Sequence, residues 1–243
     1  MGETDDVTTT ANRTQGDEPP PDGPPGPDGP DVTVDVTDAA TAARTAAASP
    51  GRTKHDLRRR IRAERRARPA ADQEADAAAL VDTVQAVPEV ARAACVTLYA
   101  SMPGEPGTGP LRAALRARGV RVLLPVVLPQ GLLDWAEDTG DLVAPAGFGG
   151  DEPAGERLGL DAIRQADVVL VPGLAVDTLG RRLGQGAGYY DRALPRLDDG
   201  VPVIAIVHDG EVLDAAVEPV PTEPHDRAVD AVVTPKGHLR LRA

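Results

Sequence analysis

The sequence predicts an α/β fold with a mainly parallel, open sheet flanked by helices. Five short runs of apolar, often β-branched residues alternate with segments whose apolar residues follow helical spacing. The runs are apolar along most of their length, which is typical of strands buried on both faces of a parallel sheet. No segment of roughly 20 to 50 residues recurs, so a repeat architecture is excluded.

Residues 1–53 are predicted to form a disordered tail, followed by a single domain over residues 54–243. The tail contains no Leu, Ile, Phe, Trp or Tyr and holds 8 of the 24 prolines, so it cannot bury enough apolar surface to order itself. Its 10 acidic and 3 basic residues contribute −7 of the net charge of −12. Composition favours a solubilising extension over an interaction or autoregulatory arm.

Residues 54–68 are predicted to form a basic helix. The run has 8 basic and 2 acidic residues, and the spacing of Leu57 and Ile61 places them on one apolar stripe. Lys54 and Arg58 have the same spacing and can point two cations toward one phosphate group. This segment alone favours a solvated basic face, with the phosphate clamp and an RNA-binding arm as the other possibilities.

The remaining elements follow in alternation. Strands are predicted at 94–99, 120–124, 167–171, 201–207 and 230–234. Helices are predicted at 71–86, 111–119 and 160–166, with a last one that opens near Gly188 and ends at Pro195. Residues 129–160 are rich in Gly, Pro and acids and are predicted as a long surface excursion over one end of the sheet, where such loops commonly line a site.

Composition limits the classes of function. Aromatic residues make up 2% of the chain, too few for base stacking, so we expect no nucleic-acid partner. The single Cys95 excludes an internal disulfide, and four scattered histidines lack the spacing of a structural zinc site. No signal sequence or membrane-spanning run is found, so we expect a cytoplasmic protein with no membrane partner. We also expect a monomer.

A glycine-rich loop follows the apolar run that ends at Pro172. Gly184, Gly186 and Gly188 alternate just before the last predicted helix. Glycines there let backbone N–H groups approach an anion, and the start of a helix adds partial positive charge. The spacing matches neither a Walker A loop nor a G-x-G-x-x-G fingerprint, so the glycines alone leave a phosphate cradle and a plain flexible turn equally open.

Polar residues beside the glycines favour the phosphate cradle. Arg182 precedes them, and Tyr189, Tyr190 and Asp191 follow. Asp191 is a candidate Mg²⁺ ligand, because Mg²⁺ on nucleotide phosphates is usually held by one or two carboxylates. The alternatives are that Asp191 only complements the helix dipole and that at least one tyrosine packs in the core.

Motifs in the same order along the chain resemble the 5-formyltetrahydrofolate cyclo-ligase family (5,10-methenyltetrahydrofolate synthetase). The central pair is V-P-G-L-A-V-D at 171–177 and R-L-G-Q-G-A-G-Y-Y-D-R at 182–192. The others are K-x-x-L-R at 54–58, Y-A-S-M-P-G-E at 99–105, P-H-D at 224–226 and D-A-V-V-T-P at 230–235. The resemblance covers nearly all of 54–235 and leaves out the tail.

The resemblance implies a Rossmann-like fold of the NagB/RpiA/CoA-transferase-like type. It also implies a ligase that converts 5-formyltetrahydrofolate to 5,10-methenyltetrahydrofolate with ATP as co-substrate and Mg²⁺. The γ-phosphoryl group would pass to the formyl oxygen, N10 would attack the activated carbon, and ADP and phosphate would be released. Such a transfer needs charge neutralisation and in-line positioning more than a covalent nucleophile.

The resemblance also assigns site residues. The predicted catalytic residues are Tyr190 and Arg182, the predicted metal ligands are Asp191 and Asp226, and the predicted substrate-binding residues are Ala100, Glu105 and Tyr190. Glu105 would accept paired N–H donors of the pterin. ATP would be bound by Lys54, Arg58, Arg182, Leu183, Gly184, Gln185, Gly186, Ala187, Gly188, Tyr189 and Tyr190.

Each assignment has a simpler alternative. Glu105 could be solvated, Asp226 could start a turn, and Tyr99 is expected to pack in the core. A second function is also possible: a catalytically weak member that binds reduced folate or nucleotide as a regulator. Gln185, Ala187 and His208 favour it, because they depart from the pattern usual in the family.

Overall fold

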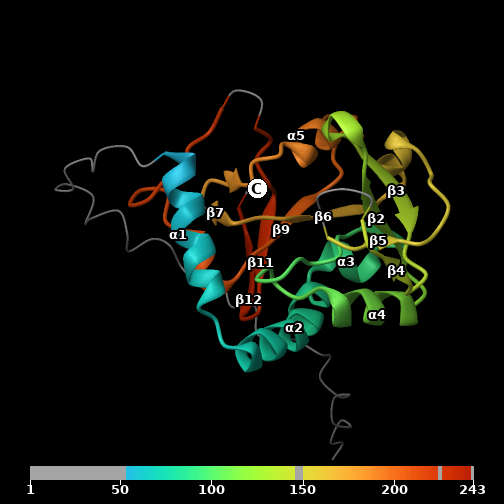
Figure 1. Cartoon of the computed structure of the whole chain (residues 1–243), viewed down its shortest axis with the longest axis horizontal. Coiled ribbons are helices and arrows are strands. Elements are labelled where there is room, and N and C mark those ends of the chain that lie inside the picture. The colour runs from blue at the N-terminus through green and yellow to red at the C-terminus, as the bar shows by residue number, and fades with distance from the viewer. Residues whose placement is uncertain (1–52, 146–149, 224–225, 242–243) are drawn as a thin grey trace, which may run out of the picture. The chain divides into compact units, whose positions relative to one another are not determined.

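The computed structural model describes residues 53–145, 150–223 and 226–241. Its centre is a seven-stranded sheet with helices on both faces (Figure 1). The strand order is β12 (Gly237–Arg240), β11 (Ala231–Thr234), β9 (Val203–Ile206), β6 (Val168–Pro172), β1 (Cys95–Thr97), β2 (Arg121–Val127) and β3 (Leu133–Glu137).

The five inner strands are parallel and are the five strands that the sequence predicts. The two edge strands, β12 and β3, pair antiparallel with their neighbours. Side chains of β6 alternate between the two faces: Val168 and Leu170 belong to one core cluster, and Val169 and Val171 belong to the other. The predicted α/β class, with its mainly parallel sheet buried on both faces, is confirmed.

Helices cover the two faces unequally. On one face lie α2 (Ala70–Gln85), α3 (Pro88–Arg92) and α4 (Gly109–Ala117), which bury Leu80, Val90 and Leu111. The other face is covered by short elements, namely the 3-10 turns η3 (Leu160–Gln165) and η4 (Leu194–Arg196) and the helix α5 (Tyr189–Ala193). The helix predicted to open near Gly188 is therefore α5, which is only five residues long and is followed directly by the 3-10 turn η4 that contains Pro195.

The predicted surface excursion over 129–160 is wrong in part. After the turn η2 (Pro129–Gly131), strand β3 extends the main sheet, and β4 (Leu142–Val143) pairs with β5 (Glu152–Pro153). Trp135 at the middle of β3 is fully buried. Asp134 interrupts the apolar pattern from which a strand would be predicted. Its carboxylate accepts hydrogen bonds from the backbone N–H groups of Trp135 and Gly159, both at 2.7 Å.

Helix α1 (Lys54–Arg66) packs on a small three-stranded sheet of β7 (Ala175–Asp177), β8 (Arg182–Leu183) and β10 (Val212–Leu213). Leu57 and Ile61 form the predicted apolar stripe and are buried there. The helix begins after Thr53, whose hydroxyl accepts the Asp56 N–H at 3.2 Å. Its basic side is not simply a solvated face, because Arg65 is buried and several arginines bind other segments, as described below.

The tail predicted over 1–53 lies outside the described residues except for residue 53. In the described part of the chain, no helix is both long enough and apolar enough to span a membrane.

Candidate active site

A cavity of about 270 Å³ lies at the carboxyl ends of the central strands. Strand β1 has β2 on one side and β6 on the other, so the chain reverses its winding direction beside β1. Open α/β sheets bind ligands at such a switch point. The cavity is lined by every site residue predicted above: Lys54, Arg58, Ala100, Glu105, Arg182, Leu183, Gly184, Gln185, Gly186, Ala187, Gly188, Tyr189, Tyr190, Asp191 and Asp226.

Cations of α1 fix the glycine-rich loop over residues 184–188. Arg58 Nε donates to the Gly184 carbonyl oxygen at 2.9 Å, and Arg62 Nη2 donates to the Gln185 carbonyl oxygen at 2.7 Å. Gly186 and Gly188 have φ angles of 106° and 71°, which only glycine adopts without strain. The loop is thus a shaped backbone turn held beside positive charge, which suits an anionic ligand.

Arg182 is a buried cation at the base of this loop. Its Nη2 donates to Asp191 Oδ1 at 2.8 Å, and its Nη1 donates to the Pro172 carbonyl oxygen at 3.2 Å. Burial lowers the pKa of Arg182 below its usual value, although the Asp191 charge opposes that change. Arg182 Nε has no hydrogen-bond partner among the described residues. A buried donor without a partner is a fitting contact for a phosphate oxygen.

Tyr190 lies against Arg182. The guanidinium carbon is 5.8 Å from the centre of the Tyr190 ring. Burial raises the pKa of Tyr190, so its hydroxyl stays protonated, and this hydroxyl also has no hydrogen-bond partner within the described ranges. Helix α5 has only five residues, so its dipole adds little positive charge at the cavity.

Lys54 and Asp226 form an ion pair in the wall of the cavity. Lys54 Nζ lies 2.8 Å from Asp226 Oδ2 and 3.0 Å from Glu223 Oε1. Burial acts to lower the pKa of Lys54, but the hydrogen bonds to these two carboxylates outweigh it and raise the pKa above 10.5. Lys54 therefore stays charged at neutral pH, as a phosphate contact requires.

Asp191 and Asp226 are the two carboxylates that the sequence assigns to Mg²⁺. Both line the cavity, and hard oxygen ligands suit this ion. Among the described residues, no group of three or more His, Cys, Asp or Glu side chains is placed to hold a metal ion. Two protein carboxylates fit a Mg²⁺ whose other ligands are phosphates and water, so the residues present fit the ion only together with a nucleotide.

Glu105 is buried and lines the same cavity. Its Oε2 accepts the Met102 N–H at 3.0 Å, and its Oε1 accepts from Gln185 Nε2 at 3.2 Å. Arg62 in turn donates to Gln185 Oε1 at 3.0 Å. A carboxylate has about four acceptor positions, so these two bonds fix the orientation of Glu105 and leave capacity for a ligand. The simpler interpretation of Glu105 as a solvated loop residue is wrong.

Several cavity residues were not predicted. Arg62 does not line the cavity but binds its glycine loop, and in the sequence it is indistinguishable from its basic neighbours. Tyr99, expected only to pack, contacts the cavity as well as the core. The further lining residues are Met102, Pro125, Val127, Leu133, Gly150, Pro172 and Glu223. Of the P-H-D motif at 224–226, only Asp226 lies within the described residues.

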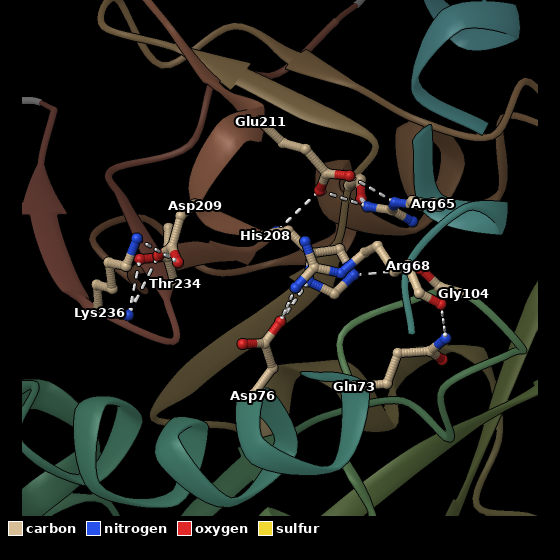
Figure 2. A network of polar contacts seen from close by, with 11 residues as sticks. Arg65, Arg68, Gln73, Asp76, Gly104, His208, Asp209, Glu211, Thr234 and Lys236 are labelled. Atoms are coloured by element: carbon tan, nitrogen blue, oxygen red, sulfur yellow. Dashed lines mark hydrogen bonds and ion pairs between the residues drawn. The ribbon is translucent and has the colours of Figure 1, made fainter. Parts of the chain in front are cut away.

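A buried polar network supports the walls of the cavity (Figure 2). Arg65 Nε and Nη2 donate to Glu211 at 2.6 and 2.7 Å, and Nη2 also donates to the Gly173 carbonyl oxygen at 2.7 Å. His208 Nδ1 lies 3.2 Å from Asp76 Oδ2, and its Nε2 lies 3.2 Å from the Gly104 carbonyl oxygen. Gly104 and Gly173 adjoin Glu105 and Pro172, so the network fixes the loops that follow β1 and β6.

We expect Glu211→Gln to lower the free energy of unfolding by about 3 kcal/mol. The change removes the negative partner of Arg65, whose side chain is 4% exposed, and leaves a buried charge uncompensated. Asp198→Asn is the control, because its ion pair with Arg164 is 55% exposed on both sides and is worth less than about 1 kcal/mol. Urea unfolding of both variants measures the difference, and equal losses would contradict the structural role of the network.

The fold and the cavity define a class of protein: an α/β protein with a cavity at the switch point of its sheet, lined by cations and a glycine loop. A model of the 5-formyltetrahydrofolate cyclo-ligase family matches residues 50–235. The 5-formyltetrahydrofolate cyclo-ligase of Mycolicibacterium smegmatis is 40% identical over 197 residues, which are 79% of this chain and 98% of the relative. The enzyme of the same name from Escherichia coli K12 is 31% identical over 179 residues, 72% of this chain and 96% of the relative.

A solved structure agrees with these sequence matches. The NMR structure of Aquifex aeolicus 5,10-methenyltetrahydrofolate synthetase superposes with a TM-score of 0.65 at 27% identity, covering 78% of this chain and 93% of the other. The chain therefore belongs to the 5-formyltetrahydrofolate cyclo-ligase family. The resemblance stated from the motifs is confirmed, as is the prediction of a ligase of that family. The roles of individual residues stay predictions.

Proposed function

We propose that the chain catalyses the ATP- and Mg²⁺-dependent cyclisation of 5-formyltetrahydrofolate to 5,10-methenyltetrahydrofolate. One observation favours this above all: the cationic glycine loop and the buried Glu105 line the same cavity and are joined by the Gln185 side chain. A triphosphate needs the first, and the polar edge of a pterin needs the second. The names of the relatives support the same reaction.

The proposed chemistry has two steps. The formyl oxygen attacks the γ-phosphorus of ATP, the bond to the bridging oxygen breaks, and ADP leaves. N10 then attacks the activated formyl carbon and loses its proton, and phosphate leaves with the former formyl oxygen. The five-membered methenyl ring forms without any change of oxidation state.

The residues of the cavity contribute position and charge. Lys54, Arg58 and Arg182 neutralise the triphosphate, and the backbone of 184–188 fixes its orientation, which accounts for most of the rate gain in phosphoryl transfer. Tyr190 and Arg182 Nε present unpaired hydrogen-bond donors where the transferring group or the formyl oxygen would lie. Glu105 would hold the pterin, so that the formyl group faces the phosphate.

Asp191 and Asp226 would hold Mg²⁺ on the nucleotide. The bound ion would neutralise the charge that develops on the phosphate oxygens. In this arrangement the bonds from Arg182 to Asp191 and from Lys54 to Asp226 keep both carboxylates oriented toward the nucleotide.

The test is turnover by the full chain. With 5-formyltetrahydrofolate, Mg²⁺ and ATP, we expect the absorbance of methenyltetrahydrofolate to appear with one phosphate released per product, and no product without ATP. A folded protein that forms no product at any Mg²⁺ or ATP concentration would contradict the proposal. If that protein still bound the folate tightly without hydrolysing ATP, the regulatory alternative would be favoured.

A further inference from the structure

Tyr99 has a buried hydroxyl group with no hydrogen-bond partner among the described residues. The residue follows β1, is 4% exposed and lines the cavity. Its backbone is fixed, because Thr108 Oγ1 donates to the Tyr99 carbonyl oxygen at 2.6 Å and accepts the Ser101 N–H at 3.1 Å. The ring itself packs within a buried core cluster.

Such a hydroxyl destabilises the folded protein, since its desolvation is not compensated. A phenylalanine would fill the same core space without that loss. Folding alone therefore does not require the hydroxyl, and Tyr99 lines the same cavity as the carboxylate of Glu105. Burial holds the pKa of Tyr99 well above 10.0, with Glu105 acting in the same direction and Arg65 against it, so the group is a neutral donor at physiological pH.

We propose that the Tyr99 hydroxyl donates a hydrogen bond to an acceptor atom of the pterin ring, next to the N–H groups that Glu105 accepts. The proposal rests on the proposed function and adds a specificity residue to it. The polar edge of a pterin has two adjacent N–H donors flanked by acceptors, so a carboxylate and a hydroxyl in one cavity match it better than a carboxylate alone. The Tyr99 hydroxyl then contacts the pterin ring, whereas Tyr190 lies beside Arg182.

Thr97 provides a matched control. It lies on β1 two residues before Tyr99, is fully buried, and also has a hydroxyl without a partner among the described residues. Unlike Tyr99, it does not line the cavity. Tyr99→Phe and Thr97→Val each remove one buried hydroxyl while nearly preserving the volume of the side chain.

We expect both variants to be more stable than the wild type, and only Tyr99→Phe to bind the folate more weakly. Both variants should raise Tm by about 2–4 °C, because each removes an unsatisfied polar group. Only Tyr99→Phe should raise KM for 5-formyltetrahydrofolate, by about tenfold, which corresponds to one hydrogen bond. The KM for ATP should stay within about twofold of the wild-type value in both variants.

The outcomes separate the two proposals. If the wild-type protein turns over and Tyr99→Phe leaves the folate KM unchanged, the role of Tyr99 is wrong while the function stands. A loss of Tm in Tyr99→Phe, or an equal rise of the folate KM in Thr97→Val, would also overturn it, since the hydroxyl would then be structural. If the wild type does not turn over, the proposed function fails first, and calorimetric titration with 5-formyltetrahydrofolate tests Tyr99 alone: an unchanged affinity in Tyr99→Phe overturns its role.

Discussion

Asp191→Asn is expected to lower kcat by about 10²- to 10³-fold, the loss typical of removing one preorganised group that stabilises charge in a transition state. The side chain keeps its shape but loses the charge that pairs with Arg182 at 2.8 Å and that would bind Mg²⁺. The Mg²⁺ concentration needed for half-maximal turnover should rise as well. The KM for 5-formyltetrahydrofolate should change little, because Glu105 is untouched.

Steady-state kinetics over a range of Mg²⁺ concentrations measure both effects. Asp198→Asn is the control, since its carboxylate lies in an exposed ion pair with Arg164 and outside the cavity. A kcat for Asp191→Asn within twofold of the wild-type value would show that this carboxylate neither orients Arg182 nor holds the metal.

Glu105→Gln is expected to raise the KM for 5-formyltetrahydrofolate by about 10- to 100-fold. Hydrogen bonds to a charged acceptor are stronger than neutral ones, and the amide also replaces one acceptor oxygen by a donor that faces the N–H groups of the pterin. Because Gln185 Nε2 and the Met102 N–H both point at Glu105, the new amide would also face donors of the protein itself. The KM for ATP should remain near the wild-type value.

The kinetic comparison needs a carboxylate elsewhere on the surface. Glu156→Gln serves, because Glu156 is exposed and does not line the cavity. If Glu105→Gln raised the KM for ATP and left that for folate unchanged, Glu105 would contact the nucleotide and not the pterin.

The parallel strands could be predicted because burial on both faces leaves an unbroken apolar run in the sequence. Strand β3 could not, since an edge strand tolerates acids such as Asp134 when neighbouring backbone N–H groups satisfy them. Strands β7, β8 and β10 are two or three residues long, which is too short for any periodicity to appear. Their pairing depends on α1 packing on them, and that contact joins distant parts of the chain.

Much of the candidate site was also visible in the sequence, because glycines, tyrosines and Asp191 stand together in one short segment. The contacts that hold these residues in place could not be predicted from the sequence. Arg65 meets Glu211 across 146 positions and Arg62 meets Gln185 across 123, and nothing in a basic run says which arginine turns inward. The hydroxyl of Tyr99 was missed for a related reason: burial was evident from its place after a strand, but the absence of a partner appears only in three dimensions.

The most direct test follows the formyl oxygen. The enzyme would be given 5-formyltetrahydrofolate that contains ¹⁸O in the formyl group, together with ATP and Mg²⁺, and the released phosphate would be analysed by mass spectrometry. Transfer of the γ-phosphoryl group to the formyl oxygen predicts one ¹⁸O atom in each phosphate. Unlabelled phosphate formed alongside methenyltetrahydrofolate would contradict it, because ATP hydrolysis and ring closure would then be separate events.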